Sequence, residues 1–393
     1  MTPDEWKKRL LIHARDGILP FWVKHSRDIE CGGFYPELSH TGEVLNPESP
    51  KGLVQHARLL WSFSNAYKVF KDDKYLDLAR DAYDFLVRHF KDREERGWFY
   101  HVSRQGKPLD TRKHLYAHSF VIYGLSEFFL ATGNRDAAGE AYQTFELLNR
   151  RALDVKYGGY LECFNRQWDA CPQIAEYGVS GDEKTMNTHL HLLEAFTNLS
   201  SAMKKLCDSS RQKLVDKHLC HLVDILLDRI YCHERKSLGL YFTPEWKRLP
   251  SPLSFGHDIE LSWLLQEAQA VTTHRPDDTF MVCMNLANQV KDKGHNPDGS
   301  FANELHLLSG EWDRKAIWWV QAEAMVGFFK AFERSKNKAY LETFEKVAEF
   351  GLKRLYDKKH GEWQQIPDSP DLPKANLWKT PYHVLRACLE IGA

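Results

Sequence analysis

The chain has 393 residues and a formal net charge of −1, so it presents no basic surface for nucleic acid or for an anionic membrane. No apolar run approaches the ~18 residues of a membrane helix, and no signal-peptide core follows the first residues. The eight cysteines are scattered without a Cys-x-x-Cys pair, which predicts free thiols in a reducing cytoplasm and neither a disulfide framework nor a zinc site.

The sequence repeats one short phrase, in which a glycine is followed by aromatic residues that begin an extended stretch. Most copies lie roughly sixty to eighty residues apart, and each lies between two stretches of helical character. Such a repeat indicates one supersecondary unit that is copied and packed against itself. The six copies are Gly33-Phe34-Tyr35, Gly97-Trp98-Phe99, Gly159-Tyr160, Gly239-Leu240-Tyr241, Gly299-Ser300-Phe301 and Gly361-Glu362-Trp363.

The segments before the phrases have one apolar face. Apolar residues recur at three- and four-residue steps with charged residues between them, as expected for outer helices that have one solvated face. The three clearest faces are Tyr75, Leu78, Ala79, Ala82, Phe85 and Leu86; then Leu214, His218, Leu222, Ile225 and Leu226; then Tyr340, Phe344, Val347, Phe350, Gly351 and Leu355.

The segments after the phrases are apolar almost all round, which is typical of helices buried between an outer ring and a lumen. They cover residues 53–70, 116–130, 186–199, 259–270, 317–332 and 377–391. Six such pairs predict an all-α fold, an (α/α)6 barrel that forms a single domain over residues 1–393. Short alternating pieces at 161–164 and 241–243 predict small β-hairpins at one mouth of the barrel.

In such a barrel the N-terminal ends of the inner helices converge on one mouth, where backbone N–H groups and helix dipoles point inward. Every unit places polar or aromatic residues at this depth of its inner helix. Their regular recurrence favours a binding or catalytic site over plain packing. The residues are Arg58 and Trp61; Tyr116 and His118; Asn187 and His191; His257, Glu260 and Trp263; Trp319 and Glu323; and Trp378 and His383.

Each of these residues also has a simpler interpretation. A histidine on an apolar helix is more often a core residue than a catalyst, and Arg58 could pair with a carboxylate that closes the barrel. His189 and His191 suggest a metal site, but residues two apart point to different sides of a helix, and no third ligand accompanies them. The sequence therefore predicts neither a metal nor a cofactor.

Four longer sequence motifs are specific enough to indicate a family. They are KTMNTHLHLLEA at 184–195, GHDIE at 256–260, WWVQAEA at 318–324 and WKTPYH at 378–383, supported by residues 51–58 and 61–64. Over its whole length the chain resembles the N-acylglucosamine 2-epimerase superfamily, and within it most closely the group of cellobiose 2-epimerases. The resemblance implies an (α/α)6 barrel that inverts carbon 2 of a reducing-end sugar without nicotinamide or metal.

The resemblance also implies roles for individual residues. His257 and His383 would be the acid/base pair, assisted by His191, Arg58 and Glu260. Trp319, Trp378 and Glu323 would line the sugar subsites, and we expect Tyr116, Asn187 and Trp263 to contact the substrate with them. The implied substrates are β-1,4-linked disaccharides, with cellobiose converted to glucosyl-mannose and lactose to epilactose.

The chemistry requires residues of these types. Once the sugar ring opens, abstraction of the carbon-2 proton gives an enediolate, and Arg58 can stabilise its negative oxygen because a guanidinium keeps its charge. Inversion needs a proton from the opposite face, so two histidines with pKa values near 6.5 suit the reaction. Glu260, one turn from His257, could hold that ring in one tautomer.

Three alternatives remain open at the level of sequence. An N-acylglucosamine 2-epimerase or a mannose isomerase would use the same catalytic set. A glycoside hydrolase would need two carboxylates flanking the bond at ~5–9.5 Å, whereas this set is centred on histidine. A non-catalytic sugar-binding barrel would tolerate loss of both histidines. In each case the expected partner is a small sugar, without nucleic acid or membrane, and the protein is expected to be a monomer or a weak homodimer.

Overall fold

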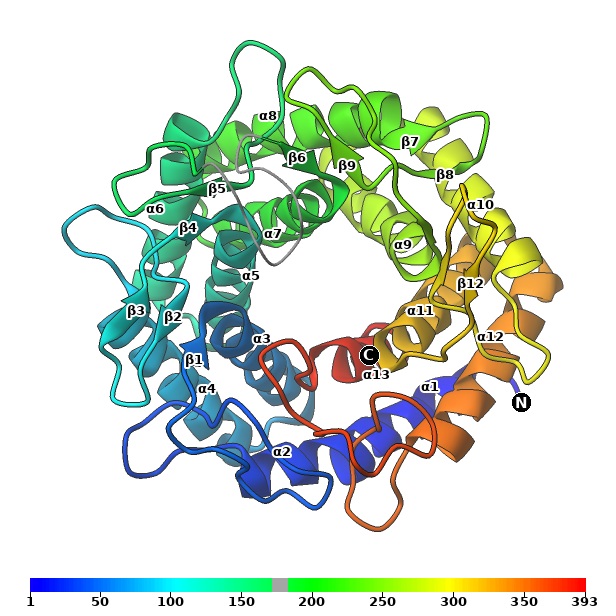
Figure 1. The fold of residues 1–393 in the computed structure, drawn as a ribbon, viewed down its shortest axis with the longest axis horizontal. Helices are drawn as coiled ribbons and strands as arrows, with labels where there is room; N and C mark the ends of the chain where they lie inside the picture. Colours follow the sequence, from blue (N-terminus) through cyan, green and yellow to red (C-terminus); the bar gives the residue numbers. More distant parts are fainter. Residues whose placement is uncertain (172–182) are drawn as a thin grey trace.

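The helices of the computed structural model, which describes residues 1–171 and 183–393, form two concentric rings (Figure 1). The inner ring consists of α3 (Leu53–Phe70), α5 (Leu115–Thr132), α7 (Met186–Lys205), α9 (Phe255–Thr272), α11 (Trp318–Ser335) and α13 (Tyr382–Gly392). The outer ring consists of α1 (Pro3–Ile12) with α2 (Leu19–His25), α4 (Asp73–Phe85), α6 (Arg135–Arg151), α8 (Ser209–Ile225), α10 (Pro276–Lys293) and α12 (Lys338–Phe350). Neighbouring inner helices are in contact, and α13 closes the ring against α11 and α3. The fold is the predicted (α/α)6 barrel.

Four short π-helical segments accompany the outer helices. They are η1 (His13–Ile18), η2 (Leu86–Phe90), η3 (Leu226–Ile230) and η4 (Gly351–Leu355). The first joins α1 to α2, and the other three follow directly on α4, α8 and α12. The last two residues of the predicted face at 340–355 therefore lie in η4. None of the helices in the described ranges combines the length and apolar character needed to cross a membrane.

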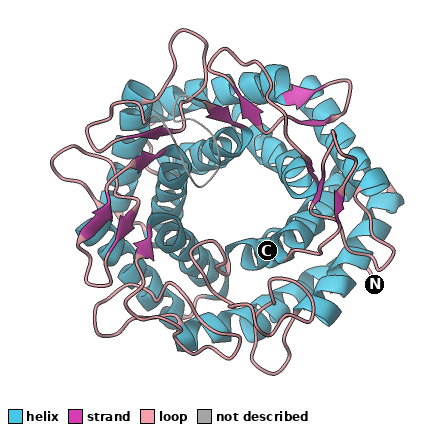
Figure 2. Ribbon diagram, in the orientation of Figure 1, coloured by secondary structure: helices cyan, strands magenta, loops and turns pink. Residues whose placement is uncertain are grey.

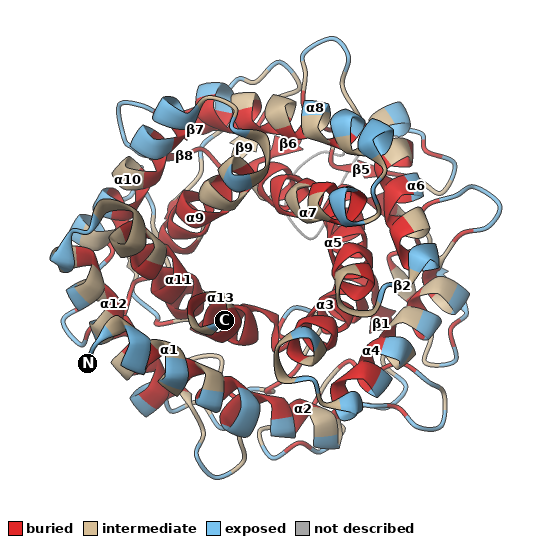
Figure 3. Ribbon diagram, turned by 180° about the vertical axis from the view of Figure 1, so that it is seen from behind, coloured by how far each residue is buried: buried red, intermediate tan, exposed pale blue. Residues whose placement is uncertain are grey.

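Burial follows the two-ring arrangement. In α5 every residue from Leu115 to Phe129 is buried, because the helix is covered by the outer ring on one side and by its lumen neighbours on the other. The outer helices expose one face to solvent (Figure 3). The predicted apolar face of α4 is buried, whereas Leu214 of α8 points outward and the buried stripe of that helix begins at Val215.

The predicted inner helices are confirmed, with one instructive difference. The segment predicted at 377–391 becomes helical only at Tyr382, because Pro381 occupies the N-cap position and the residues before it are irregular. A residue that precedes proline is disfavoured in the α conformation, which ends the backward extension of the helix. Trp378 therefore lies on a loop and not on the inner helix.

The short strands join one unit to the next (Figure 2). The strand that leads into an inner helix pairs with the strand after the next glycine phrase: β1 (Lys51–Gly52) with β2 (His101–Val102), β4 (Lys113–His114) with β5 (Cys163–Phe164), β6 (Lys184–Thr185) with β9 (Tyr241–Phe242), and β10 (Leu253–Ser254) with β11 (Glu304–Leu305). Local pairs add β3 (Pro108–Asp110) to β2, β8 (Ser237–Leu238) to β7 (Tyr231–Cys232), and β12 (Trp312–Asp313) to β11. The segments predicted as local hairpins, which contain β5 and β9, therefore pair with the strand that leads into the preceding inner helix.

Three of the six glycine phrases are tied to their own inner helices through a buried histidine. Gly97 has φ +71°, which places the next amide so that Trp98 N donates to Nε2 of buried His118 at 3.1 Å. The Nδ1 atom of His118 contacts the carbonyl oxygen of His114 at 2.7 Å, so both ring nitrogens are engaged. The same arrangement recurs at His56 and His189. His118 is therefore a structural residue and not part of the mouth site to which its position suggested it belonged.

Buried ion pairs form a second tie between the units. Lys51, Lys113, Lys184 and Lys374 immediately precede or lie close before the inner helices, and their side chains are fully buried. They contact Asp28, Asp92, Asp154 and Asp357 at 2.9, 2.8, 2.6 and 2.7 Å respectively. An arginine from the next unit joins the first two pairs, Arg104 at Asp28 and Arg166 at Asp92. At the junction of the last and first units, His40 takes this position and contacts Asp357 at 2.7 Å.

We expect Gly97→Ala to destabilise the barrel by at least ~2 kcal/mol more than Gly133→Ala. Both glycines have positive φ, so both substitutions incur backbone strain. A Cβ at residue 97 would lie 2.7 Å from Trp168 and 2.9 Å from His118 Nε2, whereas a Cβ at residue 133 meets nothing within 4 Å. Urea unfolding of the two variants measures the difference, and equal losses would contradict the proposed tie.

Candidate active site

A cavity of about 130 Å³ lies where the inner helices begin. It brings together residues from all six inner helices and from the loop before α13, and most but not all of the residues predicted for the site are among them. Its lining consists of Arg58, Tyr116, Asn187, His191, His257, Glu260, Trp318, Trp319, Trp378 and His383. Trp318 is the member that sequence reasoning did not single out, although it stands next to Trp319 in the same motif.

His383 is oriented by a carboxylate from the neighbouring helix. Its Nδ1 lies 2.7 Å from Glu323 Oε1, and Trp263 Nε1 donates to the other oxygen, Oε2, at 3.0 Å. Glu323 is fully buried and, with Trp263, lies behind the cavity wall. The prediction that these two residues line a sugar subsite is therefore not what the geometry shows. Glu323 faces His383 because the residue lies one helical turn below Trp319, deeper in the lumen.

His257 is held differently from the sequence-based expectation. Its Nδ1 lies 2.8 Å from the hydroxyl oxygen of Ser254, which precedes α9. Glu260 instead accepts a hydrogen bond from Arg386 Nη2 at 2.6 Å. The predicted Glu260–His257 pair is wrong, because Arg386, which sequence reasoning missed, provides a charged partner for the carboxylate.

His191 has its own carboxylate, Glu194, at 2.9 Å from Nδ1 and three residues further along α7. The Glu194 carboxylate also accepts hydrogen bonds from the Tyr382 hydroxyl and from Arg386. The i, i+3 spacing within the motif at 184–195 is a signal that could have identified this pair. His191 thus faces the cavity while His189 is used by the fold, which agrees with the prediction that they point to different sides.

Arg58 has no carboxylate within ion-pair distance in the described residues. Its guanidinium donates to the carbonyl oxygen of Trp378 and to the Tyr116 hydroxyl, each at 2.8 Å, and its Nε is buried without a partner there. The guanidinium carbon lies 4.3 Å from the ring centroid of Phe120. The interpretation of Arg58 as half of a structural ion pair is therefore not supported, and a positive charge with spare donors faces the cavity.

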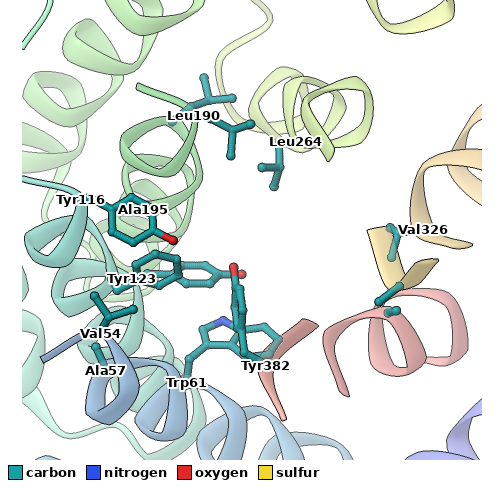
Figure 4. Packing of buried hydrophobic residues seen from close by; sticks show 14 of the residues in the cluster. Val54, Ala57, Trp61, Tyr116, Tyr123, Leu190, Ala195, Leu264, Val326 and Tyr382 are labelled. Atoms are coloured by element: carbon teal, nitrogen blue, oxygen red, sulfur yellow. The ribbon is translucent and has the colours of Figure 1, made fainter. Parts of the chain in front are cut away.

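Aromatic side chains surround the reacting groups. The Trp319 ring lies between the two candidate bases, with its centroid 4.9 Å from His257 and 5.8 Å from His383. Trp378 is 38% exposed at the entrance. Tyr116, Tyr123, Tyr382 and Trp61 project into the barrel interior (Figure 4), and of these four only Tyr116 lines the central cavity. Trp61 stacks on Tyr123 with centroids 5.4 Å apart, so it belongs to these interior side chains and not to the mouth.

Two further cavities adjoin the site. One of about 410 Å³ lies at the entrance and shares Tyr116, Asn187 and Trp378 with the central cavity; its other walls are Gly52, Leu53, Val54, Tyr100, His101 and Leu377. The other, of about 340 Å³, is reached from the C-terminal ends of the inner helices and is lined in part by Trp61, Trp263 and Glu194. The layer that contains Glu194 and Trp263 separates this rear cavity from the catalytic mouth.

Burial controls the ionisation of the site. Burial, followed by the charges of His191 and His383, lowers the pKa of His257 to about 3. Burial likewise lowers the pKa of His383 to about 3 and outweighs the opposing effect of Glu323. Burial and then Glu323 raise the pKa of Glu260 well above its usual value. Near neutral pH both histidines are thus neutral, which differs from the expected histidine pKa values near 6.5, and the raised pKa of Glu260 favours its protonated form.

Two groups of side chains in the described ranges have ligand atoms close enough to hold a metal ion. Glu260, Glu323 and His383 form the first, but Arg386 donates to both carboxylates at 2.6 and 2.7 Å and takes the place of a cation. His40, Asp357 and His360 form the second, where the Lys374 ammonium contacts Asp357 at 2.7 Å. In both groups the carboxylates already have a protein cation as partner.

The chain is similar to known proteins over almost its whole length. The family model for N-acylglucosamine 2-epimerase (GlcNAc 2-epimerase) matches residues 32–387. A cellobiose 2-epimerase of Bacteroides fragilis is 34% identical over 95% of each chain, and one of Dictyoglomus turgidum is 35% identical over 98% of this chain and 97% of its own. The solved cellobiose 2-epimerase of Bacillus thermoamylovorans B4167 superposes with a TM-score of 0.91 at 33% identity, covering 98% of each chain.

The barrel and its relatives define a carbohydrate epimerase that acts at carbon 2 of a sugar. The chain belongs to the N-acylglucosamine 2-epimerase family.

We expect treatment with EDTA to leave turnover within ~20% of the untreated rate, because arginine and histidine can perform the proton transfers without a metal. Sugar conversion is followed chromatographically before and after chelation and gel filtration. Complete loss of turnover that a divalent cation restores would overturn the assignment of the site.

Proposed function

We propose that the protein reversibly epimerises carbon 2 of the reducing-end glucose of β-1,4-linked disaccharides, converting cellobiose to glucosyl-mannose and lactose to epilactose. The observation that carries the proposal is Arg58, a buried guanidinium without a carboxylate partner in the described residues, next to neutral His191 and His257. Such a charge suits an enediolate, which is anionic only during the reaction. The similarity to proteins named cellobiose 2-epimerase supports the choice of substrate.

Ring opening is the first chemical step, since the carbon-2 proton is acidic only beside a carbonyl. Glu260 lines the cavity and its raised pKa favours the protonated form, so it is the group that donates a proton to the ring oxygen. His383 accepts the proton of the carbon-1 hydroxyl. The imidazolium that results lies 2.7 Å from the Glu323 carboxylate, which stabilises it.

Inversion then uses the two histidines in sequence. Neutral His257, which has the Ser254 hydroxyl and no carboxylate at its Nδ1, abstracts the carbon-2 proton. Arg58 stabilises the enediolate, and the His383 imidazolium delivers its proton to the opposite face of carbon 2. Ring closure returns the His257 proton to the carbonyl oxygen and restores the proton of Glu260 from the 5-hydroxyl. All three groups end in their starting protonation states.

The entrance cavity favours a disaccharide over a monosaccharide. The central cavity of about 130 Å³ opens into a larger one of about 410 Å³, which can receive a second sugar ring beyond the reacting one. Trp378 belongs to both cavities and suits stacking between the two rings. Asn187, whose Oδ1 is buried without a partner in the described part of the chain, offers an acceptor for a sugar hydroxyl.

The geometry argues against hydrolysis. Glu260 and Glu323 both bond to the same Arg386 nitrogen, and their carboxylate oxygens lie within 4.8 Å of one another. Carboxylates clustered on one cation cannot flank a glycosidic bond from opposite sides. An N-acylglucosamine 2-epimerase or mannose isomerase on the same scaffold remains the second candidate, because return of the proton to carbon 1 would use the same groups.

A cytoplasmic location is part of the proposal. None of the eight cysteines, which all lie in the described ranges, forms a disulfide, and reduced cysteines, several of them buried, suit a reducing compartment.

We expect Trp378→Ala to raise KM for cellobiose ~10-fold while kcat changes less, because the lost stacking is worth about 1.4 kcal/mol. Trp378→Phe keeps an aromatic face and is expected to recover most of the affinity. Steady-state kinetics on both variants, with thermal unfolding to confirm the fold, measures the effect. An unchanged KM in the alanine variant would return Trp378 to a packing role.

We expect epimerisation in heavy water to place deuterium at carbon 2 of the product, because the proton delivered comes from an imidazole that exchanges with solvent. His257→Asn and His383→Asn are each expected to reduce turnover ~10²–10⁴-fold. His306→Asn, at an exposed histidine of the β11–β12 loop, is the matched control and should retain activity.

The two catalytic variants should differ in one respect. In His383→Asn, His257 can still remove and return a proton at one face of sugar that binds with its ring already open, so NMR should show slow exchange at carbon 2 without inversion. Product that retains its original hydrogen would point to a hydride shift, and near-normal rates in both variants would remove the histidines from the mechanism.

A further inference from the structure

Arg386 lies at the centre of the layer directly beneath the cavity. It is three residues after His383 on α13, its side chain is fully buried, and the rings of Tyr382 and Trp263 cover it with centroids 4.3 and 4.8 Å away. Its Nη2 donates to Glu260 at 2.6 Å and to Glu323 at 2.7 Å. Its Nη1 donates to Glu194. One guanidinium thus joins carboxylates from α7, α9 and α11.

Two of these carboxylates hold histidines of the site. Glu194 contacts His191 Nδ1 at 2.9 Å, and Glu323 contacts His383 Nδ1 at 2.7 Å. A continuous path of hydrogen bonds therefore runs from one histidine to the other through Arg386. We propose that Arg386 is a positioning residue that sets the orientation and proton affinity of both His191 and His383; this proposal rests on the histidine mechanism given above.

The charges around Arg386 explain why the site needs it. Three buried carboxylates face a single guanidinium, and burial alone would keep them protonated. Although burial works in the other direction, Arg386 and His383 lower the pKa of Glu323 to about 2, and Arg386 and His191 lower that of Glu194. The titratable groups that interact with Arg386 are Glu194, Glu260, Glu323, Tyr382, Tyr123, Glu390, His191 and His383.

The arginine acts on the histidines with two opposite effects. It keeps Glu194 and Glu323 ionised, so each can hold an imidazole in one tautomer and stabilise its charged form during turnover. Its own positive charge lowers the pKa of His191 and of His383, so both return to the neutral form. A lysine would supply one charge but could not donate along three directions in a planar fork.

The test replaces Arg386 and measures both the steady-state kinetics and the NMR titration of His383. In Arg386→Met we expect kcat for cellobiose to fall ~10²-fold with KM within about threefold, because the histidines lose their orientation and not their contacts with the substrate. We also expect the 13Cε1 resonance of His383, assigned with His383→Asn, to titrate ~1 pH unit higher than in the wild type, since a nearby positive charge is removed.

Two further variants keep the test decisive. Arg386→Lys retains the charge, so the pH at which His383 titrates should return most of the way to the wild-type value, whereas kcat should recover only in part. The same variant replaces Arg386→Met in the test if that variant does not fold. Lys113→Met is the matched control, because it removes a buried cation from Asp92 in the same barrel and neither residue lines the central cavity. It should lower the melting temperature and leave kcat and the His383 titration unchanged.

An unchanged kcat and His383 titration in folded Arg386 variants, or equal changes in Lys113→Met, would overturn the positioning role. Such a result is distinct from failure of the proposed function, because wild-type protein would still incorporate deuterium at carbon 2 of the epimer.

Discussion

The turn from each outer helix into its inner helix imposes the central constraint on this barrel. At Gly33, Gly97 and Gly159 the backbone takes a positive φ, and the following amide donates to a histidine in the first turn of the inner helix. Nearby, a buried lysine and aspartate pair across the same turn. An unpaired charge or amide at this depth would cost several kcal/mol, so the turn has one stable arrangement and the inner helices start at the same level.

The active site depends on this alignment of the inner-helix starts. Since the first turns of the inner helices are aligned around the ring, residues far apart in sequence, such as Arg58, His257 and His383, reach one small cavity. The same rule on buried charge operates one layer deeper, where Arg386 compensates Glu194, Glu260 and Glu323. The fold and the site therefore share one physical principle: buried carboxylates are compensated by buried cations, lysines at the turns and Arg386 beneath the cavity.

Much of this could be predicted from the sequence, for a definable reason. The inner helix at 53–70 has the predicted bounds because its apolar character changes abruptly at both ends, and most predicted site residues line the cavity because helical periodicity places them there. Partners across the lumen could not be predicted. Periodicity along α9 suggested Glu260 for His257, but Arg386 comes from α13, beyond α11 in the ring, and no local pattern relates residues on helices that are distant in the sequence.

The order in which residues enter the barrel has a consequence for its biosynthesis. The last helix of the ring, α13, supplies His383 and Arg386, and it packs against α1, α3 and α11. Until the ribosome has released this helix, the nascent chain carries Glu194, Glu260 and Glu323 without their shared cation and with one side of the lumen open. Catalytic competence and closure of the ring therefore depend on the same helix, and a chain interrupted before residue 386 lacks the cation that its three buried carboxylates share.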